Sequence, residues 1–381
     1  MKILFFSTYF YPYISGITTY PLKILKYLSI KDDVTVLTFP HSKDSNFNGT
    51  GLKVRPLPYF FRLSKGFISL QSFWIFAAEA KKTDIVFLNI PNFEGWPLAI
   101  WAKLFGKKVY AIFHCQVKLD NRLRNRLINK FLDLSILLQL LLSEKIITNT
   151  EDYFNSLKIS SLFAKKTAYV LPPVDELKVD LKAVKKFKKI KANELWVGYA
   201  GRFASEKGLE YLVAAVARIS KNLKNVRLVF AGPAKENVIG ENVYSTQIAD
   251  LIKKMSVKNI VFGQLDGPTL KAFYKTVDVL CLPSINKTEA FGMVQVEAML
   301  QGTPVVSSNL PGVRIPVKLT HMGKVVSIKN VDEISNAIEK ILINPKKYTN
   351  KKLVNNAKKI FSSPNTYKFY DDLIHQKNAH E

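Results

Sequence analysis

The sequence predicts an α/β protein made of two doubly wound, Rossmann-like domains. Short apolar runs alternate with longer stretches of helical periodicity along the whole chain, which is typical of parallel sheets covered by helices on both faces. The alternation restarts after a Pro-Pro pair at residues 172–173. The length of 381 residues allows two domains, each with a core of its own. These three observations together indicate two facing sheets with a ligand cleft between them.

In the first half, runs rich in Val, Ile and Phe are expected to be buried strands, and the longer stretches between them are expected to be helices. The expected strands are residues 3–6, 34–37, 85–88, 109–113 and 146–148. The expected helices are residues 17–28, 67–81, 96–105 and 122–142. We expect these elements to form an N-terminal domain of residues 1–173.

The second half repeats the pattern. The expected strands are residues 195–199, 227–231, 260–262, 279–282 and 305–307. The expected helices are residues 209–220, 245–255, 269–276 and 291–301. We expect a C-terminal domain of residues 174–360 and a helical tail, 361–381, that packs back toward the N-terminal domain. Residues 178–191 are rich in lysine, and we interpret them as a solvated face or linker, with an anion site as the alternative.

The net charge of +26, from 56 Lys and Arg against 30 Asp and Glu, indicates an anionic partner. That partner would be nucleic acid, a membrane surface or a phosphorylated ligand. The excess is spread over both halves, and the sequence contains no zinc-finger, RNP or helix-turn-helix signature, so we expect no nucleic acid. Two cysteines, Cys115 and Cys281, cannot build a disulfide framework or a zinc cluster.

The N-terminal segment is expected to be a buried first strand and not a signal peptide. The apolar run at residues 3–6 is followed at once by Ser7 and Thr8, and a signal peptide needs an apolar stretch of roughly 7–15 residues. No window reaches the roughly 18 apolar residues of a membrane-spanning helix. We therefore expect a cytoplasmic protein, either soluble or peripheral at the inner face of the membrane.

Two loops after expected strands are suited to phosphate binding. Gly16 opens the first expected helix, where backbone N–H groups could approach an anion; the alternative is a structural glycine. Arg202 and Lys207 flank the turn after strand 195–199. Both could reach one diphosphate, because Arg offers a planar pair of donors and Lys a mobile charge. The alternative is two solvated surface cations.

A stronger signal lies in the segment from residue 283 to residue 299. Glu289 precedes the expected helix and Glu297 lies among apolar residues about two turns inside it. A carboxylate accepts two hydroxyl donors well, which suits the vicinal diols of a ribose or hexose. The N–H groups of Phe291, Gly292 and Met293 open the helix and could hold an anion. The alternative is a surface acid and a helix-capping acid.

These motifs resemble those of the retaining glycosyltransferases of family 4, which have the two-domain GT-B fold. The glycine loop at Gly16, the Gly201-Arg202 pair with Lys207-Gly208, and the Glu289 and Glu297 pair in a Pro-Ser…Glu-Ala-Phe-Gly…Glu-Ala-Met context occur in the family's order. The resemblance extends over essentially the whole chain.

The resemblance implies a role for each matching position. Arg202 and Lys207 would bind the donor diphosphate, Glu289 the transferred sugar and Glu297 the ribose. Gly16 would approach the diphosphate, and Gly201 and Gly263 would frame the nucleotide. His114, which follows strand 109–113, would touch the donor sugar; from the residues alone a structural histidine is the alternative. The chain would be a metal-independent hexosyltransferase that uses a nucleotide-sugar donor and no cofactor.

Three positions depart from the family pattern. Ser15 stands where a second glycine is usual, Cys115 follows His114 where an acid is common, and residues 311–316 are Pro-Gly-Val-Arg-Ile-Pro instead of a Gly-Gly-x-x-Glu run. These departures concern the acceptor more than the donor.

Two basic stretches with apolar residues interleaved, 60–68 and 118–132, suit an anionic lipid interface. We therefore expect a membrane lipid or polyprenyl-linked glycan as acceptor. Core-facing segments with a solvated basic side are the structural alternative. The functional alternatives are a GT-B sugar-phosphate or soluble-sugar synthase, and a non-catalytic relative that binds membranes or nucleic acid.

Overall fold

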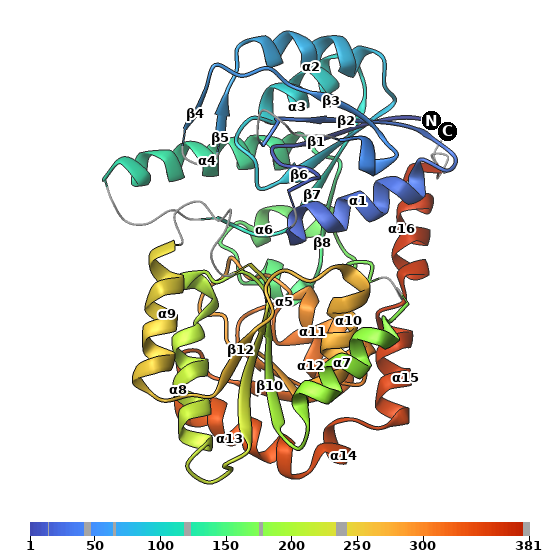
Figure 1. Ribbon diagram of the computed structural model, residues 1–381. Coiled ribbons are helices and arrows are strands. Elements are labelled where there is room, and N and C mark those ends of the chain that lie inside the picture. The colour runs from blue at the N-terminus through green and yellow to red at the C-terminus, as the bar shows by residue number, and fades with distance from the viewer. Residues whose placement is uncertain are drawn as a thin grey trace. The chain divides into compact units, whose positions relative to one another are not determined.

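The computed structural model describes residues 1–13, 15–41, 47–63, 66–117, 123–174, 178–233 and 242–375. The chain divides into two compact units (Figure 1): unit 1 is Met1–Pro173 with Ser363–Glu381, and unit 2 is Val174–Ser362. Each unit contains one parallel sheet with helices packed on it. The predicted α/β class with two Rossmann-like domains is confirmed.

Unit 1 is built on a seven-stranded parallel sheet with the order β3-β2-β1-β6-β7-β8-β9. Its strands are β1 Lys2–Ser7, β2 Asp33–Thr38, β3 Lys53–Pro56, β6 Ile85–Ile90, β7 Lys108–Phe113, β8 Lys145–Thr148 and β9 Thr167–Tyr169. Ile3 of β1 pairs with Val34 on one side and with Ile85 on the other. The strand order therefore reverses beside β1, and ligands of such sheets bind at the carboxyl ends of the strands near that point.

The helices of unit 1 follow the predicted order, with one correction. They are α1 Gly16–Leu28, α2 Gln71–Lys81, α3 Trp96–Leu104, α4 Leu123–Leu142, α5 Glu151–Asn155, α6 Ser160–Phe163 and α16 Ser363–His375. The helix expected at 67–81 begins only at Gln71. Residues before it form a hairpin of β4 Phe61–Leu63 and β5 Gly66–Ile68, in which Phe67 pairs with Arg62. The aromatic and β-branched residues of this stretch favour a strand over a helix.

The C-terminal helix α16 belongs to unit 1 and lies beside α1 (Figure 1). The Tyr20 and Tyr370 hydroxyls are hydrogen-bonded at 2.8 Å, and both side chains are buried. The rings of Tyr27 and Tyr367 stack with centroids 4.6 Å apart. The last helix of the chain therefore completes the core of the first unit, because it covers apolar surface that α1 leaves open.

Unit 2 contains a six-stranded parallel sheet with the order β12-β11-β10-β13-β14-β15. Its strands are β10 Leu195–Ala200, β11 Val226–Ala231, β12 Asn259–Val261, β13 Val279–Leu282, β14 Val305–Ser308 and β15 Gly323–Val326. Its helices are α7 Leu181–Lys191, α8 Leu209–Ile219, α9 Asn242–Lys254, α10 Gly267–Thr276, α11 Met293–Leu300, α12 Ile315–Thr320, α13 Val331–Ile343, α14 Pro345–Tyr348 and α15 Lys351–Ile360. Most of the lysines predicted to form a solvated face lie on the exposed side of α7.

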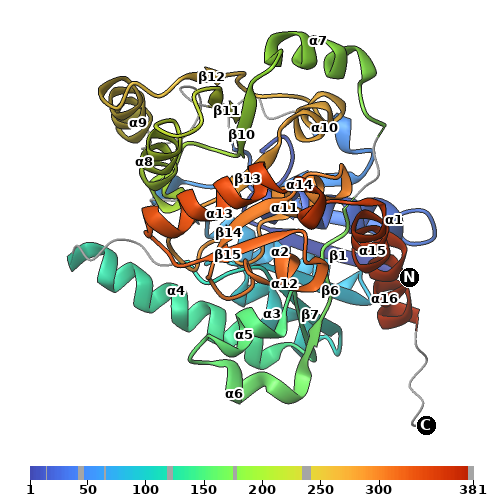
Figure 2. The ribbon, with the colours of Figure 1, turned by 90° about the horizontal axis from the view of Figure 1, so that it is seen from below.

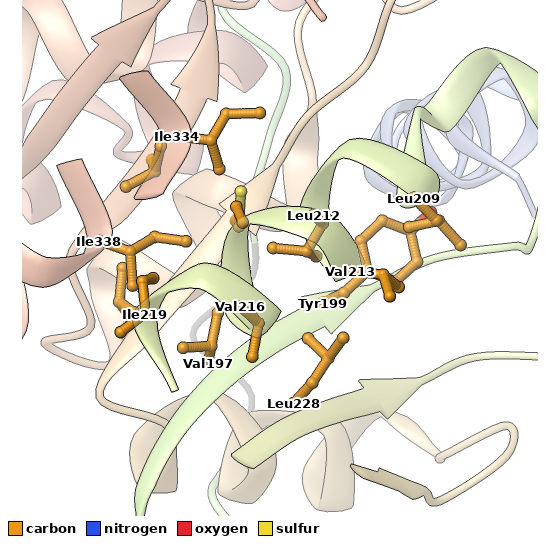
Figure 3. Packing of buried hydrophobic residues seen from close by; sticks show 14 of the residues in the cluster. Val197, Tyr199, Leu209, Leu212, Val213, Val216, Ile219, Leu228, Ile334 and Ile338 are labelled. Atoms are coloured by element: carbon orange, nitrogen blue, oxygen red, sulfur yellow. The ribbon is translucent and has the colours of Figure 1, made fainter. Parts of the chain in front are cut away.

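The core of unit 2 has two sides, because successive strand residues point to opposite faces. On one face, α8 and α13 lie side by side (Figure 2), and Val216 and Ile338 pack with Val197 of β10 in one buried cluster (Figure 3). On the other face, the ring of Trp196 contacts Phe262 with centroids 5.7 Å apart. Burial on both faces leaves the strand ends as the place for polar side chains.

Candidate functional site

Three glycines line the carboxyl edge of the unit 2 sheet. Gly201, Gly232 and Gly263 follow β10, β11 and β12, and all three have positive φ angles. The Gly232 N–H donates to the Gly263 carbonyl at 2.7 Å, and a Cβ on Gly232 would lie 2.1 Å from the Gly201 carbonyl oxygen. Gly201 and Gly263 were predicted from the sequence, and Gly232 was not. Gly232 could have been found in the same way, because it too follows an apolar run at the end of a strand.

The loop after β10 is fixed against the segment after β13. Gly208, the residue before α8, has a φ of 64°, and a Cβ there would lie 2.6 Å from the Pro283 carbonyl oxygen. The Ile285 N–H donates to the Glu206 carbonyl at 2.9 Å. Only glycine at position 208 permits this approach, which brings two sequence motifs about 80 residues apart into one site.

The two predicted cations of this loop both have carboxylate partners. The Lys207 Nζ lies 2.5 Å from Glu289 Oε2, and these side chains are 18% and 15% exposed. The Arg202 Nη2 lies 3.2 Å from Glu206 Oε1. Lys207 and Glu289 are mostly removed from water, where such a pair is strong and its geometry is defined. The structure therefore unites Lys207 with Glu289, and it places Arg202 at the start of the same loop.

Helix α11 begins two residues later than predicted. Gly292, at the N-cap, has a φ of 75°, and a Cβ there would meet Leu282 Cδ2 at 2.4 Å. The buried Gln295 side chain donates to the Phe291 carbonyl at 2.6 Å and to the Val313 carbonyl at 2.9 Å. The helix starts at Met293, so the amides of its first turn face the carboxyl edge of the sheet.

Glu297 lies in the second turn of α11, about half a turn nearer the helix start than expected. The Tyr274 hydroxyl, from α10, donates to Glu297 Oε2 at 2.9 Å. Burial and the neighbouring Glu297 carboxylate raise the pKa of Tyr274 well above its ordinary value. Tyr274 therefore remains a phenol at neutral pH and orients the carboxylate. Tyr274 was not predicted, because its spacing from Glu297 has no local signature.

His114 lies in unit 1, at the carboxyl end of β7. Its Nε2 is 2.7 Å from Asn89 Oδ1, and the Asn89 amide nitrogen donates to Ser7 Oγ and the Ile17 carbonyl. Asn89 Oδ1 thus accepts, which assigns the proton to Nε2. Burial lowers the pKa of His114 to about 3. The ring is neutral at pH 7, and its Nδ1 is a hydrogen-bond acceptor. Asn89, which positions it, was not predicted.

Gly16 begins α1 in unit 1. Ser15 and Thr18 form a capping box ahead of it, in which the Ser15 N–H donates to Thr18 Oγ1 at 2.9 Å. A Cβ on Gly16 would meet nothing within 4 Å, and its φ is not positive. The packing around Gly16 therefore does not require glycine at this position.

A metal ion bound by side chains needs several His, Cys, Asp or Glu residues close together. In the part of the chain that the structure describes, no group of three or more of them could hold a metal ion.

The two Rossmann-like units define the GT-B fold class. A solved structure of HepE from Anabaena in complex with UDP-glucose aligns with a TM-score of 0.80 and 19% identity, over 98% of this chain and 99% of HepE. At that identity the likeness shows the fold alone. Residues 182–360 match the family described as Glycosyl transferases group 1, so this part of the chain contains a domain of that family. The predicted resemblance to GT-B glycosyltransferases is confirmed.

Two curated relatives each match part of the chain. An uncharacterized glycosyltransferase of Methanocaldococcus jannaschii is 34% identical over 174 residues, which is 45% of this chain and 41% of the relative. The phosphatidyl-myo-inositol mannosyltransferase of Mycolicibacterium smegmatis is 30% identical over 145 residues, 38% of this chain and 35% of the relative. The chain thus spans about two fifths of the length of these relatives.

The buried His114 predicts a pH dependence of stability. Its folded-state pKa of about 3 lies below the ordinary value of 6.5, so the unfolded chain binds a proton that the folded chain excludes. The free energy that neutral His114 contributes to stability is fully present above about pH 6.5 and is lost as the pH falls toward 3. We expect the His114→Gln variant to lose about 2 kcal/mol less unfolding free energy than the wild type between about pH 7 and pH 5.

Urea unfolding curves at both pH values measure this difference. Carboxylates that titrate in the same range contribute equally to both proteins and cancel. Parallel pH dependences for the wild type and His114→Gln would show that the imidazole is not held neutral by burial.

Proposed function

We propose that the chain is a retaining, metal-independent glycosyltransferase that moves a hexose from a nucleotide-diphosphate sugar to an acceptor hydroxyl. The observation that supports this most is the Lys207–Glu289 pair, held at the carboxyl edge of the unit 2 sheet beside Arg202. The matched family and the UDP-glucose named in the HepE structure favour the same reaction class.

On this proposal, the cations bind the donor diphosphate. Arg202 offers planar donors and Lys207 a mobile charge, and the incoming phosphates would replace the carboxylate that each cation now contacts. Their interactions strengthen as negative charge develops on the leaving nucleotide, which lowers the barrier. The amides of Phe291, Gly292 and Met293, which lie just before and at the start of α11, would add further donors.

The carboxylates bind hydroxyl groups. Glu289 lies beside Lys207, and would accept from hydroxyls of the transferred sugar. Glu297, whose carboxylate is oriented by the Tyr274 hydroxyl, would accept from the ribose hydroxyls. The glycines Gly201 and Gly263 would let the nucleotide approach the backbone, because neither has a Cβ to obstruct it.

The proposed roles of unit 1 follow from its strand ends. His114 is neutral, so it would hold a sugar hydroxyl by a hydrogen bond and would not transfer protons as an acid. Gly16 would give the diphosphate room at the start of α1. For retention, the bond from the sugar C1 to the phosphate oxygen breaks while the acceptor oxygen attacks C1 from the same face. The acceptor proton passes to the leaving phosphate.

We propose a membrane lipid or polyprenyl-linked glycan as the acceptor, with the protein cytoplasmic and peripheral at the inner membrane face. Four large apolar side chains of α4 are at least half exposed and recur at helical spacing along one stripe: Leu127, Phe131, Leu134 and Leu141. Exposed Arg126 and Lys130 flank this stripe, and residues 118–122 of the predicted basic stretch lie outside the described residues. Such a face suits an anionic lipid surface.

The exposed α4 stripe would bind to the membrane surface and would not span the bilayer. Within the described ranges, no helix is both long and apolar enough to cross a bilayer. The similar phosphatidyl-myo-inositol mannosyltransferase is named for a lipid acceptor, which supports the same acceptor class here.

The role of Lys207 predicts a loss of turnover. We expect Lys207→Ala to reduce kcat at least about a hundredfold, because the leaving diphosphate loses a cation that acts in the transition state. UDP-glucose, UDP-N-acetylglucosamine and GDP-mannose are first screened for the rise in melting temperature that binding produces. Release of nucleoside diphosphate from the best donor then measures turnover.

Lys182→Ala is the matched control, because Lys182 is an exposed lysine on α7 of the same unit. It should leave turnover unchanged, and the melting temperatures of both variants report on folding. Wild-type turnover in a folded Lys207→Ala variant would refute the proposed role.

Metal independence predicts that chelation has no effect. Wild-type protein treated with EDTA should retain its turnover of the same donor, since Arg202 and Lys207 supply the positive charge at the diphosphate. Inactivation by EDTA that Mg²⁺ or Mn²⁺ reverses would contradict this part of the proposal.

The α4 stripe predicts binding to anionic vesicles. The double variant Leu127→Ser, Phe131→Ser should co-sediment at least about tenfold more weakly than the wild type with phosphatidylglycerol vesicles at low salt, because two apolar anchors are lost. The control is Val243→Ser, Ile343→Ser, which removes two exposed apolar side chains from unit 2. Equal binding by the two double variants, or no binding by the wild type, would exclude the α4 surface.

A further inference from the structure

Arg62 of the β4–β5 hairpin does not point away as a surface cation of the predicted basic stretch. Its Cζ lies 5.7 Å from the ring centroid of Tyr9 and 5.6 Å from that of Phe67. Its Nη2 donates to the Tyr9 hydroxyl at 2.9 Å. The Nε atom is buried and has no hydrogen-bond partner. The guanidinium is therefore held between two rings, and its Nε–H donor makes no hydrogen bond within the protein.

His41 completes the same cluster from the end of β2. Its ring centroid lies 5.9 Å from that of Tyr9 and 4.9 Å from that of Tyr13. Its Nδ1 is buried and also lacks a partner. Burial and the Arg62 charge lower the pKa of His41, so this ring is neutral at pH 7 and offers one N–H donor. The residues Tyr9, Tyr13, His41, Arg62 and Phe67 are called the Arg62 cluster below.

The charge of Arg62 is not compensated. Among the described residues, no carboxylate lies within ion-pair distance of it. The buried Glu94 beneath the hairpin accepts from Thr8 Oγ1 at 2.6 Å and from the Phe67 N–H at 2.7 Å, and so supports the backbone. Other arginines have a counterion: Arg227 makes a bidentate salt bridge with Glu194, and Arg55 forms an ion pair with Glu79. A partly buried cation without a counterion favours an anionic ligand.

The Arg62 cluster lies where unit 1 would bind a ligand. Tyr9 and Tyr13 are in the loop after β1, and His41 follows β2. These strand ends belong to the same edge of the sheet as His114, which follows β7. The edge combines one fixed guanidinium, neutral hydrogen-bonding groups and aromatic ring faces.

We propose that the Arg62 cluster binds a phosphate group carried by the acceptor, next to a sugar or polyol ring. This inference rests on the proposed glycosyltransferase function and names its acceptor class. The guanidinium binds phosphate oxygens through paired N–H donors. The tyrosine rings offer flat faces and hydroxyls to the ring of the acceptor.

The test compares phosphorylated and neutral probes on the full chain. One arm uses glucose 6-phosphate against glucose, and the other uses phosphatidylinositol vesicles against phosphatidylcholine vesicles. We expect Arg62→Gln to weaken binding of at least one phosphorylated probe about tenfold or more, while binding of its neutral counterpart stays unchanged. A response only in the vesicles assigns the phosphate to a lipid headgroup, and a response only to glucose 6-phosphate assigns it to a soluble sugar.

Arg55→Gln is the matched control, because it removes the same charge from a residue of unit 1 that is paired and 48% exposed. Equal effects of Arg62→Gln and Arg55→Gln on the phosphorylated probes, or no preference of the wild type for either of them, would overturn the proposal. Nucleotide-sugar binding, which we assign to unit 2, should be the same in all three proteins. If none of them binds a nucleotide sugar but Arg62→Gln still weakens phosphate binding, the anion site stands and the proposed function fails.

Discussion

Burial of both sheets on both faces is the constraint on which the rest of this structure depends. All six residues of β6 are buried, and successive residues of β10 pack on opposite sides of the sheet, Val197 with α8 and α13 and Trp196 with Phe262. A charge inside these buried strands would therefore carry a large desolvation penalty. Polar chemistry is confined to the strand ends and the helix starts that follow them. Both candidate sites, around Lys207 in unit 2 and around Arg62 in unit 1, obey this rule.

Charge compensation distinguishes the two sites. In unit 2, Lys207 and Arg202 already have carboxylate partners, so a diphosphate would enter by exchange, and Glu289 would then be available to sugar hydroxyls. In unit 1, Arg62 is surrounded by rings and neutral donors. On the two proposals, an anionic ligand would replace the carboxylate partners of Lys207 and Arg202. At Arg62 the ligand would instead supply a counterion that the protein does not provide.

Several features could be predicted because they depend on local order. The apolar runs identify most strands of both sheets, and Gly201 and Gly263 were found because they end such runs. The β4–β5 hairpin was missed, because its aromatic residues fit a helical period as well as a strand. Tyr274 and Asn89 were missed for a different reason. Each acts by orienting Glu297 or His114, and the partner is distant in the sequence.

The sequence by itself determined the fold class and the residue types of the candidate site in unit 2, because periodicity and short motifs depend on neighbouring residues. Only the tertiary structure decided that the last helix completes the first unit, that His114 is neutral, and that Arg62 lies without a counterion between two rings. These properties depend on burial and on contacts between distant segments. Both arise when strands that are separated in the chain pair at one edge of a sheet.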